Sequence, residues 1–428
     1  MRKILTFQNT NTNFSYLCGV IRLHLSDTTM LINFTVGNYR SFKDQKTLSM
    51  EATAITELKD SLIVDGKYKL LPSAVLYGAN SSGKSNFLKA IDKFRYLVTN
   101  SSKLNSTDKL EVTPFLLNKE KAEEPSFFEI ELLIESVRYR YGFTVDNNRI
   151  FDEWLYAAQP GKREKNLFIR TVEGIGISVN FPEGKGLEEK TRDNALFLST
   201  ADSFNGTIAG KIVSKIDTIY IASGILHEKF AELNALCHIR KDWEAGLNKF
   251  LKIFDLGFDS IEFPEDKALA KEIKAYTIHN RYDDNGEIID SVRLNMKDHE
   301  SSGTNKLFDL ASWVLSSLLY NTVLVIDELD SKLHPILTKY LINLFNDPET
   351  NKGKSQLIFA THDTNLLNTH TFRRDQIWFT EKDKTEATDL YSLVEFRDIE
   401  GNKIRKDRSI EKDYINGRYG AIPYIKNE

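Results

Sequence analysis

The sequence predicts an α/β fold with a mixed central sheet, an antiparallel β subdomain and a helical lobe. Three observations support this prediction. Residues 73–77, 322–327 and 356–361 are continuous apolar runs, typical of central parallel strands that are covered on both faces. Residues 126–156 alternate apolar and polar positions, which predicts antiparallel hairpins. Residues 187–260 carry leucine, isoleucine and phenylalanine at helical spacing, which predicts a mainly helical segment.

Length and composition indicate a large globular protein. The chain has 428 residues, more than one average domain, with 41% hydrophobic and 28% charged residues. Its formal net charge of −4 creates no global positive field, so any contact with nucleic acid would need a local basic face. The two cysteines, Cys18 and Cys237, are far apart, which argues against a disulfide framework and favours a reducing cytoplasm. We find no export signal and no membrane-spanning run, so we expect no membrane partner.

Changes in pattern along the chain indicate its domain boundaries. The first 29 residues have no clear period, whereas Met30 opens a strand-like run and would make a sensible initiator. We therefore predict five segments: an N-terminal extension (1–29), an N-lobe with the phosphate loop and the hairpins (30–185), a mainly helical inserted lobe (186–290), a C-lobe (291–396) and a charged C-terminal tail (397–428).

A glycine-rich loop follows the first apolar strand. It matches G-x-x-x-x-G-K-[ST] in full and precedes a helix, as the motif requires. Its backbone N–H groups and the helix N-terminus would bind phosphate oxygens. Lys84 would bind the β- and γ-phosphates, and the Ser85 hydroxyl would hold Mg²⁺. The alternative, a chance turn, does not explain the position between strand and helix. The predicted nucleotide-binding residues are Gly78, Ala79, Asn80, Ser81, Ser82, Gly83, Lys84, Ser85 and Asn86.

An acidic pair ends the second apolar strand. Asp327 and Glu328 follow residues 323–326 directly. A carboxylate at the C-terminal end of a central strand can complete a magnesium shell, the role we predict for Asp327. Glu328 would act as the general base on the attacking water, which makes ATP hydrolysis to ADP and phosphate the predicted reaction. Taken alone, such a pair is more often a strand that reaches solvent. Together with the phosphate loop, it predicts a P-loop NTPase.

The segment Glu300-Ser301-Ser302-Gly303-Thr304 precedes a helix predicted at 305–320, and that helix leads to the acidic strand. This order resembles the ATPase heads of the ABC, SMC and RecF group, in which an L-S-G-G-Q-like segment closes over the γ-phosphate bound by the opposite subunit. Here Glu300 replaces the leucine and Thr304 the glutamine. The resemblance implies that Ser301, Ser302 and Gly303 contact nucleotide held by a second copy. The alternative is a plain helix N-cap without a ligand.

Two histidines occupy further positions of the same resemblance. His362 follows the third apolar strand, where the group places a switch histidine that senses the γ-phosphate. His334 lies in Ser331-Lys332-Leu333-His334, where the group has an aspartate in its D-loop. We therefore predict a catalytic role for His362, alongside Glu328 and Lys84, and favour a structural role for His334.

A narrower resemblance rests on four segments, namely 38–42 (N-Y-R-S-F), 301–304 (S-S-G-T), 327–335 (D-E-L-D-S-K-L-H-P) and 417–423 (G-R-Y-G-A-I-P). Together they look like bacterial abortive-infection ATPases of the AbiL and RloA kind. The likeness implies a role in anti-phage defence beside a separate effector from the same operon, with a phage protein or nucleic acid as the trigger. The sequence does not identify the adenine contact, for which Tyr39 and Arg40 are the best candidates.

The spacing of the motifs excludes two elaborations of this group. The 216 residues from Ser85 to Ser301 must hold the hairpins and the helical lobe, which leaves no room for a long coiled coil. Only 66 residues follow His362, too few for an appended Toprim nuclease domain. We therefore expect a motor or sensor without its own nuclease.

The leading hypothesis is a nucleotide-gated dimer, or a higher oligomer, that binds ATP and Mg²⁺ and hydrolyses ATP slowly. One alternative is a RecF-like ATPase that clamps DNA through Lys403, Arg405, Lys406 and Arg408, although acidic neighbours dilute these charges. The other is a scaffold that binds ATP with little hydrolysis.

Overall fold

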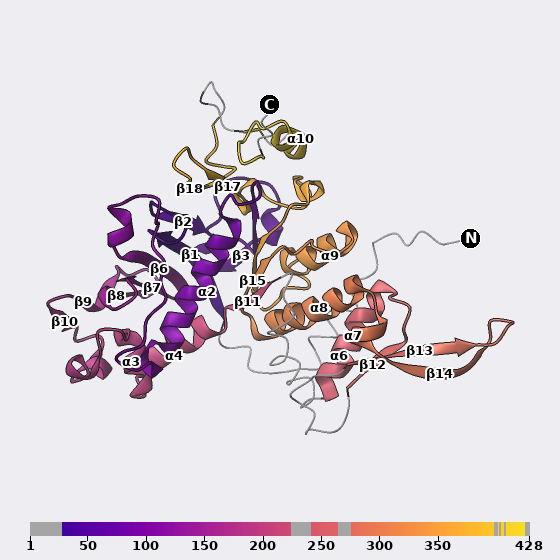
Figure 1. Cartoon of the computed structure of the whole chain (residues 1–428), viewed down its shortest axis with the longest axis horizontal. Helices are drawn as coiled ribbons and strands as arrows, with labels where there is room; N and C mark the ends of the chain where they lie inside the picture. The colour runs from indigo at the N-terminus through magenta and orange to yellow at the C-terminus, as the bar shows by residue number, and fades with distance from the viewer. Residues whose placement is uncertain are drawn as a thin grey trace.

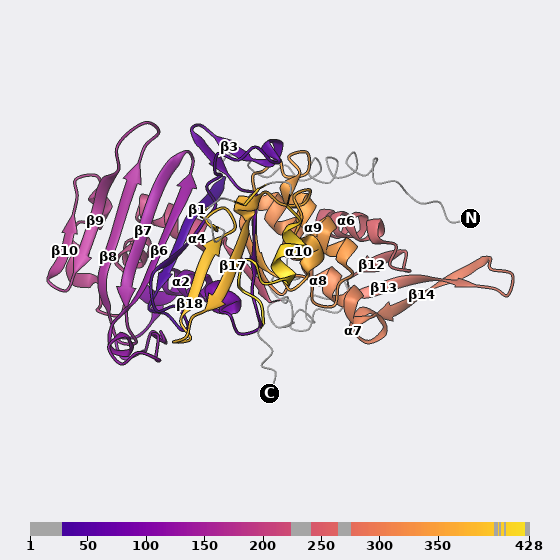
Figure 2. The ribbon, with the colours of Figure 1, turned by 90° about the horizontal axis from the view of Figure 1, so that it is seen from above.

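The structure is a computed structural model that describes residues 28–223, 241–263, 275–397, 401, 404–405 and 408–423 (Figures 1 and 2). Several predictions fall outside these residues: most of the proposed extension (1–27), both cysteines (Cys18 and Cys237), and the basic residues Lys403 and Lys406. Among the helices in the described ranges, none has both the length and the apolar character needed to span a bilayer.

A six-stranded sheet forms the centre of the molecule. Its order is β11 (Tyr220–Ser223), β15 (Val323–Asp327), β16 (Gln356–Ala360), β5 (Ser73–Tyr77), β17 (Ile377–Lys382) and β18 (Thr388–Ser392). The first five strands are parallel and β18 is antiparallel, so the predicted mixed sheet is confirmed. The three apolar runs are β5, β15 and β16, which are buried because both faces of the sheet are covered.

A seven-stranded antiparallel sheet forms a second layer (Figure 2). Its order is β10 (Gly174–Ile177), β9 (Lys165–Thr171), β8 (Ile150–Ala158), β7 (Val137–Val145), β6 (Ser126–Ile134), β1 (Thr29–Gly37) and β2 (Lys46–Ser49), and a small hairpin of β3 (Ile63–Asp65) and β4 (Tyr68–Leu70) lies nearby. The predicted hairpins are confirmed as β6, β7 and β8. The boundary at residue 29 is wrong by one position, because Thr29 is buried in β1 and pairs with Ile134.

Helix α2 (Lys84–Asn100) lies between the two sheets and joins their cores. Its buried residues Phe87, Ile91 and Phe94 form one stripe, and the rings of Phe87 and Phe94 pack edge-on against Phe34 of β1. Helices α3 (Phe197–Ser203) and α4 (Thr207–Asp217) pack beside α2. The start of α2, which carries the phosphate loop, is therefore held by a continuous apolar core.

The opposite face of the central sheet is covered by α6 (Lys241–Leu251), α8 (Ser302–Tyr320), α9 (Pro335–Asn346) and α10 (Ile410–Ile415). Side chains along β15 alternate between the two cores: Val325 faces the α2 side, whereas Leu324 and Ile326 face α8 and α9. The predicted helix at 305–320 is α8, which begins three residues earlier, at Ser302.

The prediction of a mainly helical lobe over 186–290 is wrong in part. Helices α3, α4 and α6 are present, but β11 belongs to the central sheet, and β12 (Ser260–Glu262), β13 (Tyr276–Tyr282) and β14 (Ile288–Asn295) form an antiparallel sheet that projects from the body (Figures 1 and 2). Four-residue β11 is too short to show a period. The β13–β14 hairpin did carry a signal, namely β-branched and aromatic residues around a turn at Asp283–Gly286.

The segment predicted as a charged tail also folds onto the body. Tyr414 of α10 and the following Tyr419 are buried in the core, where their rings lie beside that of Phe379 in β17. The Tyr391 hydroxyl donates to the Tyr419 carbonyl at 2.6 Å. Aromatic burial outweighs the surrounding charge here, because each ring removes a large apolar area from water.

Candidate nucleotide-binding site

The phosphate loop lies between β5 and α2, as predicted. Gly83 stands at φ +118°, a conformation that favours glycine. A Cβ at Gly83 would lie 2.5 Å from Thr388 Cγ2, and one at Gly78 would lie 2.5 Å from the Thr380 carbonyl oxygen. Both glycines are thus required by the close approach of the β17–β18 hairpin, in addition to the curl that phosphate binding needs.

The same two threonines hold the loop by hydrogen bonds. Thr380 Oγ1 lies 2.6 Å from Ser82 Oγ, and Thr388 Oγ1 donates to the Ser82 carbonyl at 2.9 Å. The backbone N–H of Thr388 donates to the Ser41 carbonyl at 2.7 Å. The loop is therefore fixed from outside its own strand and helix, which preorganises its N–H groups for a ligand.

Lys84 is folded back on the loop and is only 6% exposed. Its Nζ donates to the carbonyl oxygens of Gly78 at 2.7 Å and Ala79 at 3.1 Å. Burial lowers the pKa of Lys84 to about 8, against the opposing effect of Asp327, Glu328 and Asp330. Phosphate oxygens would favour the charged form of this amine.

The acidic pair lies at the end of β15, as predicted. Asp327 Oδ1 is buried and has no hydrogen-bond partner among the described residues. Glu328 has φ +54°, which is unusual for a residue with a side chain, and the Nζ of Lys306 in α8 donates to its carbonyl at 2.9 Å. Lys306 is itself 4% exposed, and burial lowers its pKa to about 8. The turn that aims Glu328 is therefore held by α8.

His362 follows β16 and faces the same acidic turn. Its backbone N–H lies 3.4 Å from Asp330 Oδ2. Burial, and then the charge of Lys84, lower the pKa of His362, so the neutral ring is favoured near neutral pH. His334 has a different role: its Nδ1 accepts from the Ile336 N–H at 3.3 Å and caps α9. This hydrogen bond supports the structural interpretation of His334.

These groups line one cavity of about 490 Å³. Its lining consists of Asn80, Ser81, Ser82, Gly83, Lys84, Ser85, Asn86, Asp327, Glu328, His362 and Lys382. Ten of these eleven residues were predicted from the sequence. The sequence reasoning missed Lys382, the last residue of β17. Because β17 runs parallel beside β5, its end meets the same sheet edge as the phosphate loop, a rule that could have identified it.

The residues present fit a magnesium ion. Ser85 and Asp327 line the same cavity, and the unpartnered Asp327 Oδ1 is an anionic oxygen suited to a hard cation. In the part of the chain that the structure describes, no three or more His, Cys, Asp or Glu side chains are grouped so that they could hold a metal ion by themselves. A P-loop magnesium ion does not need one, since phosphate and water supply its remaining ligands.

Segment 38–42 lies beside the start of α2. Asn86 Nδ2 donates to Ser41 Oγ at 2.8 Å. The Tyr39 ring is buried against Phe128, whereas Arg40 is exposed, so of the two adenine candidates only Arg40 is open to a ligand. Neither residue lines the cavity.

Residues 301–304, which we call the signature segment, lie apart from this cavity. Ser301 and Ser302 are exposed, and residues 301–303 do not line the cavity of their own chain. Ser301 Oγ accepts from the Thr304 N–H at 3.0 Å and so caps α8, the plain role that the sequence left open. A Cβ at Gly303 would lie 3.0 Å from the Lys332 carbonyl oxygen, so Gly303 packs closely against the backbone of Lys332.

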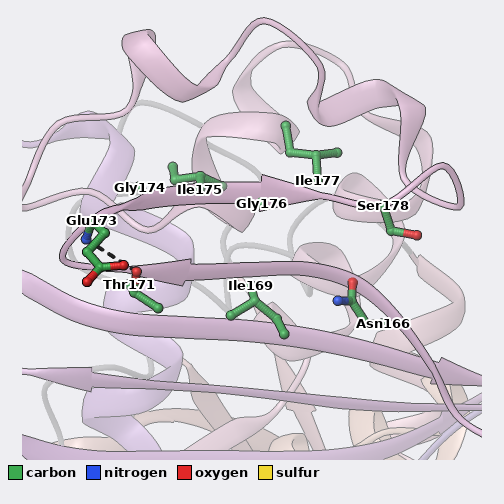
Figure 3. A pocket seen from close by; sticks show the side chains of 9 residues that line it. All are labelled: Asn166, Ile169, Thr171, Glu173, Gly174, Ile175, Gly176, Ile177 and Ser178. Carbon is green, nitrogen blue, oxygen red and sulfur yellow. Dashed lines mark hydrogen bonds between the residues drawn. The ribbon is translucent and has the colours of Figure 1, made fainter.

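A second, larger cavity has few lining groups that could take part in catalysis. This groove of about 590 Å³ lies along β9 and β10 at the edge of the antiparallel sheet, with Gly174 and Gly176 opposite Thr171 and Ile169 (Figure 3). Glu173 is its one titratable lining residue. Despite its size, it offers no set of groups for catalysis, and the phosphate-loop cavity is the better candidate.

The basic residues considered for DNA binding give little support to that alternative. Arg408 Nε lies 2.7 Å from Asp413 Oδ2, so this charge is paired within the chain. Arg405 is described, whereas Lys403 and Lys406 lie outside the described residues.

Comparisons with known proteins gave matches to solved structures and to one family model. Solved structures with a similar fold include the SMC head domain from Thermotoga maritima (TM-score 0.39, 12% identity, 85% of this chain and 98% of that chain). Another is the recombination mediator RecF in the RecFOR pathway (TM-score 0.32, 14% identity, 86% of this chain and all of that chain). Likeness at this level does not establish a function. A search of curated proteins found no match.

A family model is the more informative match. It covers residues 73–368, more than two thirds of the chain, and spans the phosphate loop, the signature segment, the acidic strand end and His362. With this coverage and this geometry, the chain belongs to the AAA family described as "AAA domain, putative AbiEii toxin, Type IV TA system".

Proposed function

We propose that this protein binds and hydrolyses ATP at sites completed by a second copy of the chain. One observation carries the proposal. The phosphate loop, the acidic pair and His362 line a single cavity, yet the exposed signature segment lies outside it. A helix N-terminus whose serine side chains are exposed can bind an anion, because its first N–H groups lack partners within the helix. In a head-to-tail pair, Ser301 of one copy would close the cavity of the other.

Each cavity residue then has a defined task. The loop N–H groups and Lys84 bind the phosphates, and Glu328 accepts the proton of the attacking water. His362, neutral near physiological pH, offers a ring nitrogen to the γ-phosphate or to this water. Ser85 and Asp327 would hold Mg²⁺, which, when bound, neutralises charge on the phosphate oxygens. Hydrolysis would remove the γ-phosphate that Ser301 contacts and so reopen the pair.

We further propose that this cycle serves as the sensor of a cytoplasmic anti-phage system. Two observations support this role: the family description names a putative AbiEii toxin of a Type IV TA system, and four segments of the sequence resemble abortive-infection ATPases. In this proposal, a phage protein or nucleic acid is the trigger and a separate effector is the output.

Replacing Glu328 with Gln tests the enzymatic proposal. We expect ATP binding to persist, multiple-turnover phosphate release to fall about 100-fold, and a dimer to accumulate with ATP and Mg²⁺. Phosphate release and sedimentation velocity measure the two effects. The matched control is Glu349→Gln, an exposed carboxylate that lies 3.9 Å from Lys352 and does not line the cavity. If the Glu328 variant keeps full turnover, or stays monomeric with ATP, the proposal is wrong.

A further inference from the structure

The β13–β14 hairpin leads directly into the signature segment. It projects from the body (Figures 1 and 2), and among the described residues β12 pairs with Tyr276, Thr277 and Ile278 at its base. After Asn295, the short helix α7 (Met296–His299) leads to Glu300 and Ser301. The base of the hairpin is therefore close to the signature serine along the chain.

The Glu300 side chain also connects the β13–β14 hairpin to the signature segment through hydrogen bonds. Its Oε1 accepts from Thr277 Oγ1 at 2.8 Å, and His279 Nε2 lies 2.8 Å from the same oxygen. Thr277 is fully buried and the Glu300 side chain is 10% exposed, so water competes little for these contacts. Hydrogen bonds to a carboxylate are stronger than neutral ones and fix its direction.

The backbone on the other side of Glu300 is held by α8. Asn305 Nδ2 donates to the carbonyl oxygens of Glu300 at 3.2 Å and Ser301 at 3.1 Å. The Glu300 N–H donates to the Met296 carbonyl at 3.0 Å. Residues 300–301 are thus fixed between the hairpin and the helix. A leucine at position 300 could not accept from Thr277 or His279, and would leave the buried Thr277 hydroxyl without this acceptor.

We propose that Glu300 is a positioning residue that ties Ser301 to the β13–β14 hairpin, so that the hairpin sets how the signature segment meets the nucleotide of a second copy. This inference rests on the proposed composite site. It makes the hairpin the regulatory element of that site, because a change in its orientation moves the Glu300 carboxylate and with it the start of α8.

A double-mutant cycle tests the link. The variants Glu300→Ala, His279→Ala and the pair are made in the Glu328→Gln protein, whose ATP-dependent dimerisation is followed by sedimentation velocity. We expect each single change to weaken dimerisation about tenfold, and the pair to be no worse than the stronger single change, since both remove one contact. Binding of a fluorescent ATP analogue to the monomer should not change, because the phosphate loop is untouched.

Two further variants separate positioning from general destabilisation. Glu300→Gln keeps an acceptor oxygen and should dimerise within about twofold of the parent. Asp290→Asn, on the same hairpin, breaks an exposed ion pair with Arg281 (3.2 Å) and should have no effect. Melting temperatures measured in parallel show whether the variants remain folded.

The outcomes distinguish this inference from the proposed function. If the Glu328→Gln parent does not dimerise with ATP, the proposed function fails before any hairpin variant is compared. If the parent dimerises but the two single changes are additive, or Glu300→Gln is as weak as Glu300→Ala, the inference alone is wrong.

Discussion

The phosphate loop and the signature segment are built in opposite ways. The loop is enclosed: its glycines pack against Thr380 and Thr388, and Lys84 is buried among backbone carbonyls. The signature segment is exposed at the start of α8, and the hydrogen bonds of Glu300 and Asn305 hold its backbone from the side of the protein body. One half of the site is therefore preorganised within a single chain. The other half presents polar groups to solvent, and we infer that it acts only when it meets the cavity of a second copy of the chain.

The largest expected effect comes from the enclosed half. Lys84→Ala removes the buried cation at the phosphate position and should weaken ATP binding about 100-fold, because hydrogen bonds to charged groups in a buried site are strong. Isothermal titration calorimetry checks this affinity. Lys382→Ala, at the rim of the same cavity, is the control and should cost less than tenfold. Equal losses for the two lysines would contradict a special role for Lys84.

The second prediction tests whether the β17–β18 hairpin constrains the phosphate loop. Gly83→Ala should destabilise the protein by about 2 kcal/mol and reduce ATP binding, because the residue has φ +118° and its Cβ would meet Thr388. Chemical denaturation measures the change. Gly161→Ala is the control, since its φ is also positive (+70°) but open space surrounds it. If Gly83→Ala is as mild as the control, the β17–β18 hairpin does not constrain the loop.

A change in the exposed signature segment should have a smaller effect, and this effect should fall on ATP hydrolysis rather than on ATP binding. Ser301→Ala should leave ATP binding to the monomer unchanged and lower hydrolysis about tenfold, through loss of one hydrogen bond to a charged phosphate. Loss of the helix cap should cost about 1 kcal/mol of stability. Steady-state ATPase assays over a range of protein concentrations measure the first effect. A defect in monomer binding instead would place Ser301 in the site of its own chain.

The effect that is smallest at neutral pH is the dependence of ATP affinity on pH. Lys84 has a pKa of about 8 before phosphate binds, and bound phosphate raises it. Below about pH 8 the amine is charged in both states, so its contribution to ATP affinity is constant; above pH 8 affinity should fall by up to tenfold per pH unit. Titrations between pH 7 and 9.5 test this. The Lys84→Arg variant should lose the slope, because arginine stays charged. A slope that persists in this variant must come from another group.

Most of the cavity residues could be predicted from the sequence because they lie at or just after the ends of strands. The phosphate loop, Asp327, Glu328 and His362 each follow an apolar strand, and the carboxyl ends of parallel strands meet at one edge. The same reasoning missed Lys382, which lacks a motif, and treated residues 186–290 as helical although β11 and the β12–β14 sheet lie there.

What the sequence determined by itself is the set of chemical groups and the strands and helices that carry them. Only the tertiary structure decided three further points: that Thr380 and Thr388 fix the loop, that Lys306 holds the turn at Glu328, and that Glu300 joins the hairpin to Ser301. These contacts join residues up to about 300 positions apart, for example Ser82 and Thr388. Local patterns arise from backbone periodicity, which neighbouring residues encode. Distant contacts depend on how whole layers pack, which no short segment encodes.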